Sequence, residues 1–219
     1  MRIYESYKAK PSLNKRNFRT LKSIILASGS SIRKKILDDS GMIFDIVLSD
    51  VDESEIKKSL QTSDLKLICL SLAKAKAIAV SIKNPDSYVI GSDQICCFEN
   101  EIFSKPKTKE NCFKTLSKLS GNTHHQNCGI SICLDGKEIW QNYDQAALSM
   151  KVLSDNEINS YIDLDEPLMA CGAYKFESQG SSLFEEIEGD DSTIKGLTLD
   201  PILNFLNSKN VIEFSAEKN

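Results

Sequence analysis

The sequence predicts a single α/β domain: one mixed, strongly twisted sheet with flanking helices and a central cleft. In the first half of the chain, short β-prone runs alternate with amphipathic helical segments, which is typical of α/β folds. In the second half, strands follow one another in pairs with fewer helices, and there is no internal repeat or low-complexity tract. A cleft between the two halves is the natural place for a ligand.

Length and charge divide the chain into a body and a basic extension. The 219 residues are 41% hydrophobic, which is enough to bury a substantial core. The net charge of −4 separates into +5 for residues 1–21 and −9 for the rest. We therefore expect a disordered extension at 1–22, a domain at 23–208 and a C-terminal tail at 209–219. The extension could instead be a nucleic-acid-binding arm or resemble a transit segment, but the acidic body argues against a nucleic-acid partner.

The cysteines and the hydropathy pattern indicate the cellular compartment to expect. The seven cysteines lack any C-x-x-C spacing and most lie in apolar runs, so we expect reduced core residues. No run approaches the roughly 18 apolar residues that span a bilayer, and the N-terminus has no secretion-like apolar segment. A cytoplasmic protein with no membrane partner is expected.

The first predicted elements are a strand at 23–27, a small-residue turn, and a helix. Ser30 or Ser31 can cap this helix, leaving its first N–H groups to face an anion. Arg33 and Lys34 stand in the first turn, where the helix dipole disfavours cations. A bound phosphate would explain them, and a surface helix with two solvated cations is the alternative.

The next segments bring acidic and basic residues to the ends of elements. A strand at 44–48 leads into an acidic run, and a helix that opens at Asp64 carries Lys76 at the end of its apolar face. Lys76 either extends to water at the helix edge or points into a cleft. A short buried strand at 88–90 places residues 91–94 at its carboxyl end, where ligands gather in α/β sheets.

The second half contains a hairpin and further helices. Asp135 and Gly136 separate two β-like runs and signal a tight turn, while Ser154 and Glu157 form a capping box. The predicted elements are helices near 108–120, 154–162 and 202–206, and strands at 95–98, 128–134, 137–140 and 145–152.

Several familiar catalytic motifs are absent: no phosphate-binding P-loop, no dinucleotide fingerprint, no H-E-x-x-H zinc motif and no G-x-S-x-G elbow. His124 and His125 are the only histidines, so they make a poor metal set and are treated as ordinary polar residues. The remaining oxygen ligands and cations suit a triphosphate bound with a hard cation, because carboxylates hold Mg²⁺ while Lys and Arg neutralise phosphate. They are Ser28, Ser30, Arg33, Glu53, Lys76, Asp93 and Lys105.

The order of short motifs resembles the Maf family. The run from Ile25 to Arg33 resembles its L-A-S-x-S-x-x-R opening, and residues 51–53, Val-Asp-Glu, resemble its D-E element. Similar matches follow at residues 72–77 (L-A-x-x-K-A), 91–94 (G-S-D-Q), 105–106 (K-P), 119–121 (L-S-G), 166–167 (E-P), 171–175 (C-G-A-Y-K), 188–190 (E-G-D) and 196–197 (G-L). The resemblance extends from residue 23 to about 206.

This resemblance implies a Maf-type, ITPase-like fold and a nucleoside triphosphate pyrophosphatase that uses Mg²⁺ or Mn²⁺; it also allows a homodimer. By motif matching, Asp93 would be the proton acceptor and would bind metal with Glu53. Ser28, Ser30, Arg33, Lys76 and Lys105 would bind the substrate phosphates.

Three positions resemble those that distinguish Maf subgroups by base: Ile32, Gln94 and Glu177. Gln94 and Glu177 resemble the subgroup acting on 7-methyl-GTP, and a carboxylate suits the donor edge of guanine. A dTTP/UTP pyrophosphatase of the same family and a non-catalytic nucleotide-binding division regulator are the alternatives.

Overall fold

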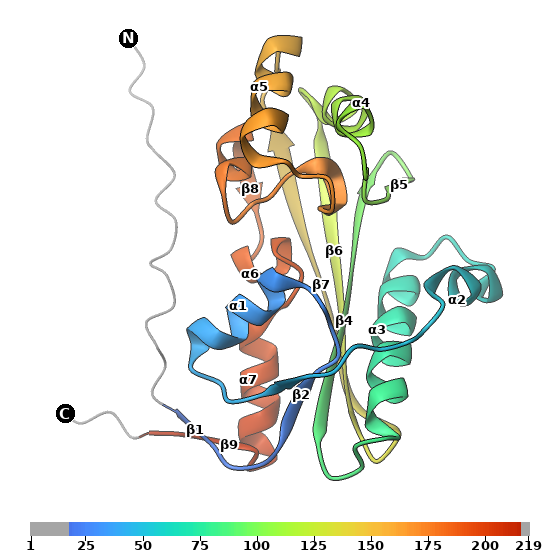
Figure 1. Cartoon of the computed structure of the whole chain (residues 1–219), viewed down its shortest axis with the longest axis vertical. Helices are drawn as coiled ribbons and strands as arrows, with labels where there is room; N and C mark the ends of the chain where they lie inside the picture. Colours follow the sequence, from blue (N-terminus) through green and yellow to red (C-terminus); the bar gives the residue numbers. More distant parts are fainter. Residues whose placement is uncertain (1–17, 216–219) are drawn as a thin grey trace.

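A seven-stranded mixed sheet forms the centre of the structure, a computed structural model that describes residues 18–215 (Figure 1). The strand order is β3-β2-β4-β6-β7-β8, with β5 added beside β4. β2 runs parallel to β3 and β4, and the remaining pairs are antiparallel. The strands are β2 (Ile24–Leu26), β3 (Asp45–Ile46), β4 (Tyr88–Phe98), β5 (Glu101–Phe103), β6 (Thr123–Leu134), β7 (Lys137–Met150) and β8 (Phe184–Glu188).

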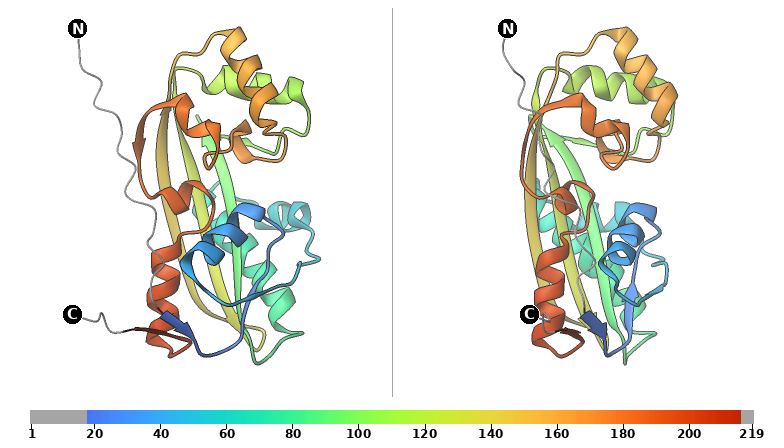
Figure 2. Two further views of the ribbon diagram at one scale, coloured as in Figure 1. Left: turned by 60° about the vertical axis from the view of Figure 1, so that its left-hand side comes forward. Right: turned by 90° about the vertical axis from the view of Figure 1, so that its left-hand side faces the viewer.

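Helices cover this sheet in two groups that define two lobes (Figure 2). In the lower lobe, α1 and α7 pack on one face of the sheet around Leu37 and Leu203, while α3 packs on the opposite face. In the upper lobe, α4 and α5 enclose a separate core with η1 and η2. The helices are α1 (Ser31–Ser40), α2 (Glu53–Leu60), α3 (Leu65–Ser81), α4 (Lys109–Leu119), α5 (Asp155–Asp165), η1 (Cys171–Ala173), η2 (Gln179–Leu183), α6 (Asp191–Ile194) and α7 (Leu199–Ser208).

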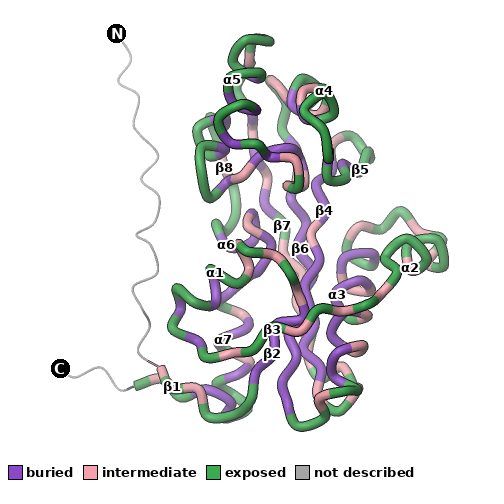
Figure 3. The backbone as a smooth tube through the Cα atoms, viewed as in Figure 1, coloured by how far each residue is buried: buried purple, intermediate pink, exposed green. Residues whose placement is uncertain are grey.

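Three long strands, β4, β6 and β7, run through both lobes and join them. Figure 3 shows β4 and β6 as mainly buried, whereas β7 is largely intermediate or exposed and α2 lies at the surface. The described chain is therefore one α/β domain with a mixed sheet, and the predicted fold class is confirmed. The two lobes thus share strands but have separate clusters of buried hydrophobic residues.

Local capping explains where the helices near the cleft begin. Ser30 caps α1 by accepting a hydrogen bond from the Arg33 amide, and Asp64 caps α3 in the same way. Ser154 and Glu157 form the predicted capping box of α5. These helix starts agree with the sequence predictions.

α3 approaches the sheet closely because two glycines face it. A side chain at Gly91 would meet the carbonyl oxygen of Ala73 at 2.2 Å, and one at Gly129 would meet the backbone of Cys69 at 2.6 Å. Only residues without a Cβ permit this distance between helix and strand. The close approach brings the C-terminal half of α3, with Lys76, against the middle of β4.

Several strand predictions are wrong in extent. β6 begins at Thr123 and not at residue 128. β4 does not end at residue 90 but continues to Phe98, so residues 91–94 lie inside a strand rather than beyond its end. The predicted strands 137–140 and 145–152 are one strand, β7. Pairing with β6 along nearly the whole of both strands keeps the backbone extended through segments that carry no local strand signal.

The described part of the N-terminal extension is ordered, which corrects the expectation of disorder at 18–22. β1 (Phe18–Thr20) pairs antiparallel with β9 (Ile212–Phe214), so residues on either side of the predicted domain pair with each other. Arg19 forms an ion pair with Glu213, and Phe18 packs edge-on against Phe214. The rest of the predicted extension and tail, residues 1–17 and 216–219, lies outside the described residues.

The seven cysteines are free thiols, and all except Cys171 are buried, as predicted. Within residues 18–215, no helix has both the length and the apolar character needed to cross a membrane.

Candidate functional site

A cleft of about 810 Å³ opens between the two lobes, along one edge of β4. On this edge β2 pairs with residues 88–90 and β5 pairs with residues 96–98. Residues 91–95 have β6 as their only strand neighbour in the described chain, so their other edge faces the cleft. The gap between two short partner strands thus creates the site.

The structure brings every residue predicted for the site to this one cleft. These residues come from both lobes, and the first and last of them lie almost 150 positions apart in the sequence. The lining includes Ser28, Ser30, Ile32, Arg33, Glu53, Lys76, Asp93, Gln94, Lys105 and Glu177.

Asp93, Lys76 and Glu53 form an ion-paired group in the lower wall. The Lys76 ammonium lies 2.7 Å from Asp93 Oδ1 and 2.8 Å from Glu53 Oε1. Lys76 and Asp93 are 8% and 6% exposed, so both belong to the wall rather than to the surface. Of the two orientations that the sequence left open for Lys76, the structure selects the one pointing into the cleft.

Glu53 stays ionised in this group. Partial burial acts to raise the pKa of Glu53, but the hydrogen bond and the charge of Lys76 outweigh it and hold the pKa below its usual value. Lys57 and Lys105 lower it further through their charges. The site therefore contains two carboxylates next to several cations, an arrangement suited to a polyanion bound together with a metal ion.

Arg33 is held by the protein as well as facing the cleft. Its Nε donates to the carbonyl of Gly196 at 2.8 Å, and its Nη1 donates to Ser92 O at 3.0 Å and to Ser28 Oγ at 3.2 Å. No acceptor in the described chain is bonded to Nη2, which remains available to a ligand. Lys34 instead pairs with Asp38 at the surface, so the two cations of the first helical turn have different roles.

Gln94 is tied to the segment around α6. Its Nε2 donates to Ile194 O at 2.5 Å and to Thr193 O at 3.4 Å. The carbonyl of Gly196 also accepts from Ser92 Oγ at 2.7 Å. Gln94 therefore anchors the segment that contains α6 to β4.

The upper wall of the cleft contains Glu177 and, deeper in the lobe, a group of buried polar side chains. Glu177 is exposed and lines the cleft, next to the buried Phe176. Deeper in the wall, the Tyr174 hydroxyl is hydrogen bonded to Gln126 Nε2 at 2.7 Å and to His124 Nε2 at 2.8 Å. Burial, together with the neighbouring His125, lowers the pKa of His124 to about 4, so this histidine is neutral near pH 7 and is a structural residue.

Four further cleft lysines were not singled out from the sequence: Lys57, Lys107, Lys175 and Lys195. Lys57 follows Glu53 by four positions, a helical spacing that would have placed both on one face if the short helix α2 had been predicted. Lys175 ends the C-G-A-Y-K run that resembles a family motif, although no role was assigned to it. Lys107 and Lys195 carry no such local signal, because only the packing of the two lobes brings their segments to the cleft.

The candidate metal ligands at this site are two carboxylates. Among residues 18–215 there is no group of three or more His, Cys, Asp or Glu side chains arranged to hold a metal ion. Asp93 and Glu53 each use one oxygen on Lys76, which leaves the second oxygen of each as a ligand atom. Since Mg²⁺ usually keeps several waters and binds one or two carboxylates together with substrate phosphates, this donor set fits it.

Comparison with known proteins gives consistent similarities over most of the chain. The model of the family described as Maf-like protein matches residues 23–209. A nucleoside triphosphate pyrophosphatase of Legionella pneumophila is 37% identical over 191 residues, covering 87% of this chain and 96% of the relative. A nucleoside triphosphate pyrophosphatase of Bradyrhizobium diazoefficiens is 39% identical over 191 residues, covering 86% and 95%.

Two further similarities complete the comparison. A 7-methyl-GTP pyrophosphatase of Mesorhizobium japonicum is 39% identical over 194 residues, covering 87% of this chain and 98% of the relative. Among solved structures, the Staphylococcus aureus Ham1 protein is 21% identical with a TM-score of 0.33, covering 61% of this chain and 73% of that one.

Proposed function

Because the chain belongs to the Maf family, we propose that it is a nucleoside triphosphate pyrophosphatase that splits its substrate into a nucleoside monophosphate and pyrophosphate. One structural observation carries this proposal: the phosphate-type cations, the two carboxylates and the base-type residues line a single cleft. Its volume of about 810 Å³ is in the range of a small-molecule site.

Asp93 is the proposed proton acceptor. It lies in the rigid middle of β4, held by Lys76 at 2.7 Å, so the direction of its carboxylate is fixed before a substrate arrives. A carboxylate in this position can orient a water for attack on the α-phosphorus and take its proton. Lys76, Arg33 and Lys105 would neutralise the charge that develops on the departing pyrophosphate.

A divalent cation, Mg²⁺ or Mn²⁺, would be held by the remaining carboxylate oxygens of Asp93 and Glu53. When bound, it would supply charge neutralisation to the phosphate oxygens. Glu53 lies at the first position of α2 with a half-exposed side chain, whereas the side chain of Asp93 is buried in the wall of the cleft.

The proposed base is guanine, with 7-methyl-GTP as the substrate. The carboxylate of Glu177 can accept two hydrogen bonds from the N–H donors along one edge of guanine, and uracil or thymine has no such pair. The Mesorhizobium relative, which is named 7-methyl-GTP pyrophosphatase, supports this choice. A dTTP/UTP pyrophosphatase is the alternative within the same reaction class.

The test is pyrophosphate release with Mg²⁺ from 7-methyl-GTP, GTP, UTP and dTTP. Asp93→Asn should lower turnover by about a hundredfold or more, while Asp86→Asn, an exposed residue outside the cleft, should not change it. Unchanged turnover in Asp93→Asn would exclude Asp93 as the base. Absence of release from every nucleotide, with nucleotide binding intact, would favour the division-regulator alternative.

The base assignment has a separate test. Glu177→Gln should shift the preference away from guanine nucleotides, whereas Glu185→Gln, an exposed neighbour outside the cleft, should leave the substrate ranking as it is. The same ranking in Glu177→Gln and the parent protein would reject the assigned role of Glu177.

A further inference from the structure

The six lysines of the described chain that line the cleft divide into two classes by their partners. In the first class the ammonium group is engaged: Lys76 by Asp93 and Glu53, Lys175 by a backbone carbonyl and Lys195 by a carboxylate. In the second class, Lys57, Lys105 and Lys107, no ion pair or side-chain hydrogen bond is formed within residues 18–215.

We propose that Lys57 and Lys107 act with Lys105 as a clamp on the pyrophosphate portion of the substrate, the β- and γ-phosphates. This inference rests on the proposed function, which supplies a triphosphate. Lys105 belongs to the motif-matched phosphate set, whereas Lys57 and Lys107 are identified here by their position and their lack of partners. The site would therefore also bind free inorganic pyrophosphate.

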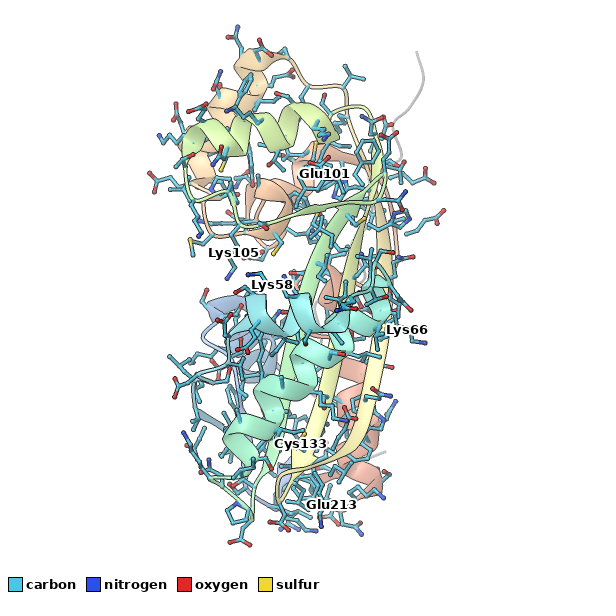
Figure 4. The ribbon with its side chains drawn as sticks, turned by 90° about the vertical axis from the view of Figure 1, so that its right-hand side faces the viewer. Lys58, Lys66, Glu101, Lys105, Cys133 and Glu213 are labelled. Carbon is cyan, nitrogen blue, oxygen red and sulfur yellow. The ribbon has the colours of Figure 1, made fainter. Side chains whose placement is uncertain are left out.

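The three lysines approach the cleft from opposite lobes. Lys57 lies on α2 in the lower lobe, and Lys105 and Lys107 lie between β5 and α4 in the upper lobe. Figure 4 shows Lys105 extending from the upper lobe toward α2, where Lys58 is labelled. All three lysines line the same cleft as Glu53.

The loop that carries Lys105 and Lys107 is built to hold them in place. Pro106 between them is buried, and its carbonyl accepts from Asn111 Nδ2 at 3.0 Å. Lys107 has a positive φ of 66°, an unfavourable conformation for a residue with a Cβ, and its amide donates to Leu168 O at 2.8 Å. The surrounding contacts thus keep the backbone in a strained conformation that positions both lysines at the cleft.

The chemistry of the ligand follows from this charge distribution. Lysines that form no close ion pair on two facing walls leave positive charge at the cleft, and a polyanion bound between them would neutralise that charge. The two terminal phosphates carry most of the charge of a nucleoside triphosphate, and a nucleoside monophosphate lacks them. The clamp should therefore distinguish a triphosphate or pyrophosphate from a monophosphate.

The experiment compares Lys57→Gln and Lys107→Gln with Lys58→Gln. Lys58 is the adjacent residue on α2, is also exposed, and does not line the cleft, so it controls for the loss of one charge on the same helix. Calorimetry with inorganic pyrophosphate and Mg²⁺ should show an affinity loss of roughly tenfold for each clamp variant, the effect of losing one charge-assisted hydrogen bond. Lys58→Gln should change it by less than about twofold.

Binding of a nucleoside monophosphate provides the second measurement. The clamp predicts that its affinity stays within about twofold in all three variants, because only the terminal phosphates are lost as partners. Equal loss of pyrophosphate affinity in Lys58→Gln, or a parallel loss of monophosphate affinity, would overturn the clamp. If the pyrophosphate pattern holds but no nucleotide is hydrolysed, the clamp stands and the proposed function fails. If nucleotides are hydrolysed but KM is unchanged in both clamp variants, the proposed function stands and the clamp is rejected.

Discussion

Replacing Lys76 with methionine removes the ammonium that joins Asp93 to Glu53 while keeping most of the volume of the side chain. The contact with Asp93 is buried, with side-chain exposures of 11% and 9%, whereas the Glu53 side chain is 48% exposed. Breaking a buried pair by removing one partner costs about 3 to 5 kcal/mol, and the half-exposed pair adds less than about 1 kcal/mol. We expect the free energy of unfolding to fall by about 3 kcal/mol. This value is at the lower end of the range for a buried pair, because Asp93 faces a cleft that water can enter.

The assay is thermal and urea unfolding of four proteins: the parent, Lys76→Met, Asp93→Asn and the double variant. For a chain of this size each 1 kcal/mol corresponds to roughly 2–4 °C, so Lys76→Met should lower Tm by about 6–12 °C. Asp93→Asn should cost less, because Lys76 retains Glu53 as a partner. The double variant should be less destabilised than the sum of the single variants, by about 2 kcal/mol, since it leaves no unpaired buried charge.

Lys74→Met is the matched control. Lys74 lies on the same helix and pairs with Glu138 at 3.0 Å, but its side chain is 47% exposed. Its replacement should cost less than about 1 kcal/mol. Additive single-variant costs in the double variant, or equal losses in Lys74→Met and Lys76→Met, would show that the buried pair contributes no coupling and would refute the reasoning.

Three further outcomes follow from the structure. Arg33→Lys cannot reproduce the forked contacts to Ser92, Gly196 and Ser28, so unfolding measurements should show a loss of about 2 kcal/mol; wild-type stability would argue against a structural role for the guanidinium. Gly91→Ala would place a Cβ 2.2 Å from the Ala73 carbonyl oxygen, so α3 must move away from β4, and we expect both a stability loss of about 1–3 kcal/mol and reduced pyrophosphate release. Burial lowers the pKa of His124 from 6.5 to about 4, so the unfolded state binds this proton more readily than the folded state does. The free energy of unfolding should therefore fall by up to about 3 kcal/mol as the pH is lowered from 6.5 to 4. A His124→Phe variant should lose most of this pH slope, and an unchanged slope would assign it to other groups.

Local sequence patterns were sufficient for most helices of the fold. The helix starts at Ser30, Asp64 and Ser154 were visible because a capping side chain acts on amides two or three residues away. The tight turn at Asp135 and Gly136 was visible for a similar reason, since both residues adopt the positive φ that its composition indicated. The family motifs also identified ten of the residues that line the cleft, because those residues lie in or near short ordered runs.

Strand extents could not be obtained in this way, because strand pairing joins residues far apart in sequence. Gly91 and Ser92 interrupt the local strand signal of β4, yet β6 pairs with them and keeps them extended. The pairing of β1 with β9 joins residues separated by almost the whole chain, so neither end showed its partner. α2 was missed because it is short and has no buried residue, so it lacks the apolar stripe that marks a helix.

By itself, the sequence determined the fold class, the family, and the side chains proposed for phosphate and metal binding, because these depend on residue type and local spacing. The tertiary structure alone decided how those side chains are used. It directed Lys76 into the cleft instead of to the surface, because Gly91 and Gly129 let α3 pack close to the sheet. It also left Lys57 and Lys107 without partners at the cleft, since ion pairing depends on which segments the two lobes bring together.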